Sequence, residues 1–145
     1  KSRPLPGMLV SGCPNLLMPS GPQSGAASTN YPRGIENGVD WCTELLEYMW
    51  ERDLTYLEAT EEAEKRWTDH VVKMYSVMLM RKAQSWFTGY NSNVEGHEAG
   101  KVRYMVYNGG TPKYVASIGE VASKDYEGIR FAAGAKDSGE LLVAD

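Results

Sequence analysis

Apolar residues recur at helical spacing from Arg33 to about Arg52. The steps are three and four residues, which places these side chains on one face of a helix. The predicted stripe consists of Ile35, Val39, Cys42, Leu46 and Met49, widened by Trp41, Leu45 and Tyr48. The opposite side carries acidic residues and is typical of a solvated face: Glu36, Asp40, Glu44, Glu47 and Glu51.

The same period continues in a second segment that begins at Thr60, whose side chain suits a helix N-cap. Its apolar line consists of Ala63, Trp67, Val71, Met74 and Met78. The pattern predicts a helix to about Met80, with His70 beside the apolar line as a partly buried structural histidine. Residues 53–59, between the two helices, are expected to form a connector.

Strands are predicted where apolar residues run continuously or alternate. Residues 15–20 form a continuous apolar run, which is typical of a buried strand in a parallel sheet. Residues 102–107 alternate, and residues 126–131 form a shorter candidate strand. Between these two, a helix is predicted from Thr111 or Pro112 to about Lys124. Residues 132–145 are small and acidic and are expected to form a disordered tail.

Residues 81–101 show no period at all. A loop of this length inside a compact domain is either functional or mobile. The loop carries several aromatic residues, Trp86 among them, and such residues suggest a lid or a binding edge.

Residues 21–32 lie between the first predicted strand and the first helix and are rich in glycine and other small residues. Such residues let the backbone approach another group closely. Thr29 and Asn30 suit an N-cap, and Pro32 suits the first helical turn. The free N–H groups of a helix start attract an anion or an electron-rich ring. An ordinary strand-to-helix connection is the alternative, because neither glycine-rich nucleotide-binding pattern is present.

Composition narrows the classes of function. The chain has 145 residues, enough for one domain, with 42% hydrophobic and 23% charged residues. Its formal net charge is −4, and its 15 basic residues are dispersed among 19 acidic ones, so nothing favours nucleic acid or an anionic membrane. No apolar run approaches the roughly 20 residues of a membrane span. With no secretory signal visible, we expect a cytoplasmic protein with reduced thiols at Cys13 and Cys42.

The residues that could hold a metal ion are far apart in the sequence. Cys13, Cys42, His70 and His97 include no closely spaced ligand pair, so no metal site is predicted. No G-x-S-x-G motif is present, and a hydrolase is not supported.

Short motifs follow one another along the chain up to about residue 131. They are Gly12-Cys13-Pro14-Asn15-Leu16-Leu17, Gly21-Pro22-Gln23-Ser24, Thr29-Asn30-Tyr31, Ile35-Glu36, Val39-Asp40-Trp41, Glu62-Ala63-Glu64, Trp67-Thr68-Asp69-His70-Val71, Ser85-Trp86-Phe87-Thr88-Gly89-Tyr90-Asn91, Tyr107-Asn108-Gly109-Gly110, Tyr114, Glu120-Val121-Ala122 and Tyr126-Glu127-Gly128-Ile129. Their order and spacing resemble the C-terminal third of the class B flavoprotein monooxygenases, and within that class the Baeyer–Villiger monooxygenases.

The resemblance implies an α/β fold: a C-terminal fragment, mostly helical with a few strands, of a flavoprotein with Rossmann-like FAD and NADP domains. The parent enzyme would use FAD, NADPH and O2 to insert one oxygen atom next to a ketone carbonyl, giving an ester or a lactone. Residues 1–55 would close the FAD-binding domain with its last strand and helix, and residues 56–82 would link to the NADP region. Residues 83–101 would form a mobile control loop, and residues 102–131 a C-terminal strand and helix.

The resemblance also assigns roles to six residues. Asn30 and Tyr31 match the pair that contacts FAD in the family. Ala27, Ser28 and Thr29 match a bulge that shapes the substrate pocket. Trp86 matches the aromatic residue of the mobile loop that folds over NADP and substrate.

The family's other motifs are absent from this chain. It contains no G-x-G-x-x-G and no F-x-G-x-x-x-H-x-x-x-W, so the main catalytic residues are expected upstream and the chain alone is expected to be inactive. The expected partners are a ketone, O2 and the FAD and NADP domains of the same polypeptide. The alternatives are an N- or S-oxidising monooxygenase on the same scaffold and a non-catalytic helical binding module.

Overall fold

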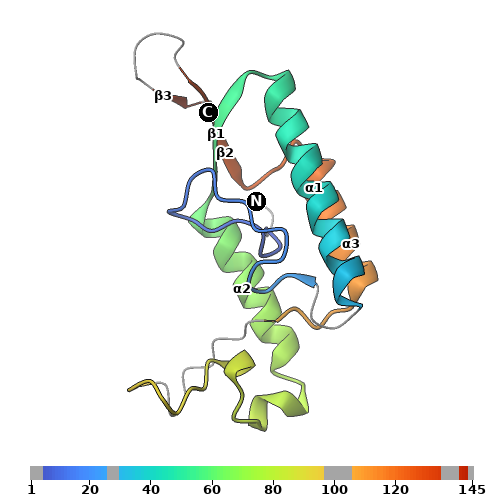
Figure 1. The fold of residues 1–145 in the computed structure, drawn as a ribbon, viewed down its shortest axis with the longest axis vertical. Helices are drawn as coiled ribbons and strands as arrows, with labels where there is room; N and C mark the ends of the chain where they lie inside the picture. Colours follow the sequence, from blue (N-terminus) through green and yellow to red (C-terminus); the bar gives the residue numbers. More distant parts are fainter. Residues whose placement is uncertain (1–4, 26–29, 97–105, 135–140, 144–145) are drawn as a thin grey trace.

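The computed structural model describes residues 5–25, 30–96, 106–134 and 141–143 (Figure 1). Its helices and strands are, in chain order, α1 (Tyr31–Glu51), β1 (Leu54–Ala59), α2 (Glu61–Tyr75), the 3-10 helices η2 (Leu79–Lys82) and η3 (Trp86–Thr88), α3 (Thr111–Ala122), β2 (Ile129–Gly134) and β3 (Leu141–Val143). The small sheet lies at one end of the molecule, and α2 leads away from it toward residues 79–96 at the other end.

Helix α1 begins where its capping residue predicts. Asn30 is the N-cap, and its side-chain oxygen accepts a hydrogen bond from the Arg33 N–H at 3.4 Å. Thr29, the other capping candidate, lies outside the described residues. The helix ends at Glu51, and Asp53 then takes a positive φ of 54°, which turns the chain back into β1.

The buried face of α1 is rotated relative to the predicted stripe. Its buried residues are Gly34, Gly38, Trp41, Cys42, Leu45 and Met49. Val39 and Leu46, which the sequence places on the stripe, are exposed. The cause is that two glycines form the face that meets the N-terminal loop: a Cβ at Gly38 would lie 2.0 Å from the Pro19 carbonyl oxygen. A pattern of apolar side chains gives no weight to a glycine that is buried for close approach.

Helix α2 has the predicted cap but is shorter than expected. The Thr60 hydroxyl accepts a hydrogen bond from the Ala63 N–H at 3.2 Å, and Glu61 and Glu62 lie in the first turn. The helix ends at Tyr75 rather than near Met80. The next residue, Ser76, donates its hydroxyl to the Lys73 carbonyl at 2.7 Å, a local bond that favours helix ends.

His70 is exposed, so its prediction as a partly buried histidine is wrong. It lies at the edge of the buried line of α2, and its ring centroid is 5.4 Å from that of Trp67. His70 is exposed because α2 buries only the side that carries Ala63, Trp67, Val71 and Tyr75.

The sheet is antiparallel and not parallel as predicted. Its order is β1-β2-β3, with Leu57 paired to Phe131 in β1 and β2, and Ala132 paired to Val143 in β2 and β3. Residues 54–59 are therefore a strand and not a connector. The register shifts between Leu54 and Tyr56, and this irregularity interrupts the two-residue alternation that would have indicated a strand.

Residues 15–20 form no strand, which corrects the sequence prediction. Asn15 has a φ of 58°, and Leu16 is exposed. Asn15 instead covers the outer edge of β1: its N–H donates to the Leu57 carbonyl at 2.9 Å, and its side-chain oxygen accepts from the Leu57 N–H at 3.0 Å. Asn15 thereby satisfies the backbone N–H and C=O of Leu57 at the open edge of β1.

The C-terminal part of the chain is more ordered than predicted. Residues 132–134 belong to β2 and residues 141–143 form β3, so a disordered tail is wrong for both; residues 135–140 and 144–145 lie outside the described part. Of the strand predicted over residues 102–107, only Val106 and Tyr107 are described, and both are buried without strand structure. Helix α3 begins at Thr111 as predicted.

The core lies among the N-terminal loop, the three α-helices and the sheet. Helices α1 and α3 run side by side, and the Trp41 indole Nε1–H donates to the Ile118 carbonyl at 2.9 Å. The ring of Tyr126 packs edge-on against Trp41 and Tyr48, with centroids 5.4 and 4.9 Å apart. Aromatic residues with a polar handle therefore fill this interior and find partners for their polar groups.

Candidate functional site

The start of α1 is an open helix N-terminus. Asn30 and Tyr31 are both exposed, and the Tyr31 hydroxyl lies 3.1 Å from the Ser20 hydroxyl. The first turn contains no acidic residue and carries Arg33. The helix dipole favours an electronegative group at the site, whereas the Arg33 guanidinium lies 3.6 Å from the Glu36 carboxylate. Ala27, Ser28 and Thr29, predicted to shape a substrate pocket next to it, lie outside the described residues.

Glycines hold the preceding turn against its neighbours at close range. A Cβ at Gly25 would lie 2.4 Å from Cγ of Tyr114, and one at Gly21 would lie 2.3 Å from the Gly7 carbonyl oxygen. The Tyr114 hydroxyl in turn donates to the Pro6 carbonyl at 2.9 Å. The turn therefore sits between α3 and the N-terminal loop with no room for a side chain at either position.

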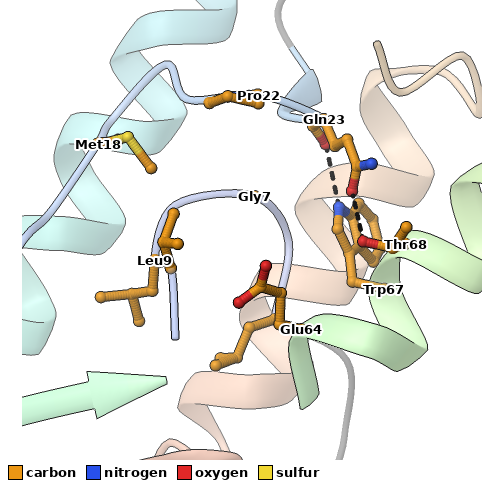
Figure 2. A pocket seen from close by; sticks show the side chains of 10 residues that line it. Gly7, Leu9, Met18, Pro22, Gln23, Glu64, Trp67 and Thr68 are labelled. Atoms are coloured by element: carbon orange, nitrogen blue, oxygen red, sulfur yellow. Dashed lines mark hydrogen bonds between the residues drawn. The ribbon is translucent and has the colours of Figure 1, made fainter. Parts of the chain in front are cut away.

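Helix α2 contacts the same turn through two polar side chains. The Trp67 indole Nε1–H donates to the Gln23 carbonyl at 3.1 Å, and the Thr68 hydroxyl lies 3.2 Å from the Gln23 side-chain oxygen (Figure 2). Gln23 has a φ of 62°, a conformation that an L residue rarely adopts unless its surroundings hold it. Trp67 was predicted as a core residue of α2, but its polar contact with Gln23 was not.

A pocket of about 210 Å³ lies beside this contact. Its walls are mainly apolar and come from the N-terminal loop and α2: Leu5, Gly7, Leu9, Val10, Met18, Pro22, Gln23, Glu64, Trp67 and Thr68. The Glu64 carboxylate is its charged group, and one oxygen accepts a hydrogen bond from the Ser11 N–H at 2.7 Å. That bond connects the carboxylate of α2 to the N-terminal loop at the edge of the pocket.

A second carboxylate fixes the N-terminal loop to the sheet. Glu58 of β1 is buried and accepts hydrogen bonds from the Tyr56 hydroxyl at 2.6 Å, the Gly12 N–H at 2.9 Å and the Arg130 guanidinium at 2.6 Å. The hydrogen bonds from Tyr56 and Gly12, helped by the Arg130 charge, lower the pKa of Glu58. No local pattern predicts this cluster, because its members lie up to 118 positions apart (Gly12 to Arg130).

We expect Glu58→Gln to weaken the fold at neutral pH. Because the pKa of Glu58 is lowered in the folded chain, its stabilisation is present above the unfolded-state pKa of about 4.3 and is lost as the pH falls below it. The difference in unfolding free energy between wild type and variant should therefore shrink between about pH 7 and about pH 3. Urea unfolding across this range measures it.

Glu36→Gln is the matched control for Glu58→Gln. Glu36 is exposed and lies 3.6 Å from Arg33 on the surface, an arrangement that contributes little to stability. Parallel stability curves for wild type and Glu58→Gln at all pH values would contradict the assigned role of Glu58.

Trp86 lies in the segment that the sequence marks as aperiodic, and the described residues 79–96 contain only two short 3-10 helices. Its side chain is 69% exposed and stacks on Phe87, with centroids 3.9 Å apart. The Ser85 hydroxyl accepts from the Phe87 N–H and caps the turn. Within the described residues, no hydrogen bond, ion pair or ring contact joins Trp86 to Asn30 or Tyr31. The structure thus places the predicted site residues on separate segments.

The buried titratable groups outside these clusters are held in their neutral forms. Burial raises the pKa of Cys42 to about 11 and raises the pKa of Tyr107 and Tyr114. Cys13 is exposed, and both cysteines are free thiols. The described residues include no group of three or more His, Cys, Asp or Glu side chains arranged to hold a metal ion. Nor does any helix among them have the length and hydrophobicity to span a membrane.

Comparison with known proteins finds relatives that are monooxygenases. No family model matches the chain. Phenazine N-monooxygenase PhzNO1 from Lysobacter antibioticus is 36% identical over 123 residues, which is 85% of this chain and 21% of that protein. Cyclopentanone 1,2-monooxygenase from a Comamonas species is 32% identical over 126 residues, 87% of this chain and 22% of that enzyme.

The fold comparison agrees. The crystal structure of cyclohexanone monooxygenase from Rhodococcus sp. Phi1 bound to NADP+ matches with a TM-score of 0.77 and 27% identity, over 92% of this chain and 24% of that one. The chain spans about a fifth of the length of the curated relatives it matches. By both sequence and fold, the chain belongs to the Baeyer–Villiger family of flavoprotein monooxygenases.

Proposed function

We propose that this chain is part of an FAD- and NADPH-dependent monooxygenase that inserts one oxygen atom from O2 next to a ketone carbonyl, giving an ester or a lactone. The observation that carries the proposal is the similarity to cyclic-ketone monooxygenases over more than four fifths of the chain in both sequence and fold. The bound flavin supplies the oxygen-activating chemistry, and residues of this chain shape the space around it.

The start of α1 fits an electronegative edge of the flavin. Asn30 and Tyr31 are exposed, the dipole of a 21-residue helix ends there, and no carboxylate in the first turn repels electron density. The glycine-rich turn before it brings the backbone close to its neighbours without side chains in the way. In this proposal, residues 1–55 complete the FAD domain with helix α1, although they contribute no parallel strand of their own among the described residues.

The roles of the other segments are proposed from the same family resemblance. Residues 56–82 link to the NADP region, residues 83–101 form the control loop and residues 102–131 the C-terminal unit. Ala27, Ser28 and Thr29 are small and would leave a roomy pocket for a bulky or cyclic ketone. Ser28→Leu should then narrow the range of ketones oxidised, and an unchanged range would count against the pocket assignment.

N-oxidation is the second candidate, because the 36% identical relative is a phenazine N-monooxygenase. Assays on the full-length protein that contains this chain distinguish ketone oxidation from N-oxidation. The purified protein should show flavin absorbance and should oxidise NADPH when cyclopentanone or cyclohexanone is added, with a lactone identified by mass spectrometry. Oxidation of phenazine to an N-oxide with no lactone formed would favour the second candidate. A protein without flavin or NADPH oxidation would contradict both and favour a binding module.

Trp86→Ala should reduce ketone turnover about tenfold or more while leaving flavin content unchanged. The exposed indole stands on a segment with few anchors, where it can fold over cofactor and substrate. Turnover is measured as lactone formation, and flavin content by absorbance after denaturation. Trp50→Ala makes the same change at another exposed indole, on α1, and should leave turnover near wild type. Equal losses of flavin and turnover in Trp86→Ala would indicate a structural role.

A further inference from the structure

The turn before α1 is held by an unusual pair of contacts to one residue. Helix α2 donates from Trp67 to the backbone of Gln23 and places Thr68 at hydrogen-bonding distance from its side chain. Gln23 takes a positive φ, and Gly7 lies so close beneath it that a Cβ there would be 2.3 Å from the Pro22 carbonyl oxygen. Because this conformation is unfavourable for a free chain, the turn depends on its surroundings, and the contacts from α2 are hydrogen bonds that reach Gln23 from another element.

At its C-terminal end, the same helix leads into the segment that contains Trp86. Helix α2 ends at Tyr75, whose hydroxyl donates to the Met80 carbonyl of η2 at 3.1 Å. Figure 1 shows α2 reaching from the sheet toward residues 79–96. Helix α2 therefore contacts the turn before α1 near its start and η2 just beyond its end, and Trp67 is its buried contact with the turn.

We infer that Trp67 is a positioning residue that sets where the turn at residues 21–25 and the start of α1 lie, and thereby determines which ketones the enzyme accepts. The inference rests on the proposed function for its second half. Trp67 touches neither cofactor nor substrate in this scheme; it acts through the carbonyl of Gln23.

The test compares two conservative variants of the full-length protein. Trp67→Phe keeps an aromatic ring and removes the indole N–H. Trp41→Phe makes the same change at another buried indole, which donates to the Ile118 carbonyl in the packing of α1 on α3, away from the turn. Both variants lose one buried hydrogen bond, so both should lose comparable thermal stability, and stability alone cannot distinguish them.

Hydrogen–deuterium exchange is the first readout and needs no activity. Trp67→Phe should exchange about fivefold faster than wild type in peptides covering residues 18–25, because the loss of one net hydrogen bond shifts a local opening equilibrium by about that factor. Trp41→Phe should leave these peptides unchanged. Thr68→Val removes only the hydroxyl near the Gln23 side chain and should raise exchange in the same peptides, which keeps the test decisive if Trp67→Phe does not fold. Equal exchange at residues 18–25 in all variants would overturn the inference.

Kinetics is the second readout. Trp67→Phe should raise KM for the preferred ketone about fivefold with kcat within about twofold, because a displaced turn weakens substrate binding more than the chemical step. It should also change the ratio of kcat/KM between cyclohexanone and cyclopentanone, whereas Trp41→Phe should not. Identical kinetics in the two variants would overturn the selectivity role. Inactivity of the wild-type protein toward all ketones would instead contradict the proposed function, and the exchange result would still decide whether Trp67 positions the turn.

Discussion

Gly38→Ala should destabilise the chain by about 3 kcal/mol, even though it places a better helix former inside α1. The added Cβ would lie 2.0 Å from the Pro19 carbonyl oxygen and 2.9 Å from the Pro19 carbonyl carbon. Both are backbone atoms, which cannot move aside as the end of a flexible side chain can. Either α1 or the N-terminal loop must shift, and this loop is bound to the sheet through Asn15 and Gly12.

Gly119→Ala is the control, with an opposite sign. Gly119 lies inside α3, and a Cβ there meets no atom within 4 Å. The substitution should therefore stabilise the chain by about 0.5 to 1 kcal/mol through helix propensity alone. Urea unfolding of both variants, followed by tryptophan fluorescence, measures the contrast. Stabilisation by Gly38→Ala would show that the loop yields at little cost and that α1 does not depend on close approach.

Sequence reasoning located the helices because each carries a local signal. Thr60 caps α2, Asn30 caps α1, and Thr111 opens α3, all as predicted. A capping side chain and a three-to-four-residue period act within one turn, so a single sequence can disclose them. The family resemblance was confirmed, because the match extends over most of the chain. It depended on the order and spacing of many motifs, each of which is weak by itself.

Strands β1 and β3 escaped prediction, whereas the strand predicted over residues 126–131 is confirmed in part, since residues 129–131 lie in β2. A strand depends on partners distant in sequence, which no local pattern discloses. Strand β1 pairs with β2, about 70 positions away, and it contains Glu58, whose charge does not suit a buried strand unless Arg130 and Gly12 lie next to it. Its irregular register also hides the alternation. The candidate site also combines local and distant contacts. Asn30 was predictable as a helix cap from its own sequence, whereas the hydrogen bond from Trp67 to Gln23 joins two elements that no local pattern relates.

The second large effect is expected for Leu45→Ala, which should cost about 3 kcal/mol, while Leu46→Ala should cost less than about 0.5 kcal/mol. The sequence ranks these neighbours in the opposite order, with Leu46 on the central stripe and Leu45 at its edge. In the structure Leu45 is 0% exposed and Leu46 is 52% exposed, because the glycine face of α1 turns the helix toward Pro19. Truncating Leu45 leaves a cavity in the packed core, and truncating Leu46 removes a side chain that already meets solvent.

Urea unfolding of the 145-residue chain compares the two leucine variants directly, since they differ by one position on the same helix and make the same chemical change. A larger loss for Leu46→Ala than for Leu45→Ala would mean that α1 buries the stripe read from the sequence, and equal losses would also contradict the rotated face. Repeating the pair in the full-length protein separates two origins of burial. If Leu46→Ala lowers the free energy of unfolding only in the full-length protein, other parts of the polypeptide cover the outer face of α1. The apolar stripe in the sequence would then be explained by that second interface.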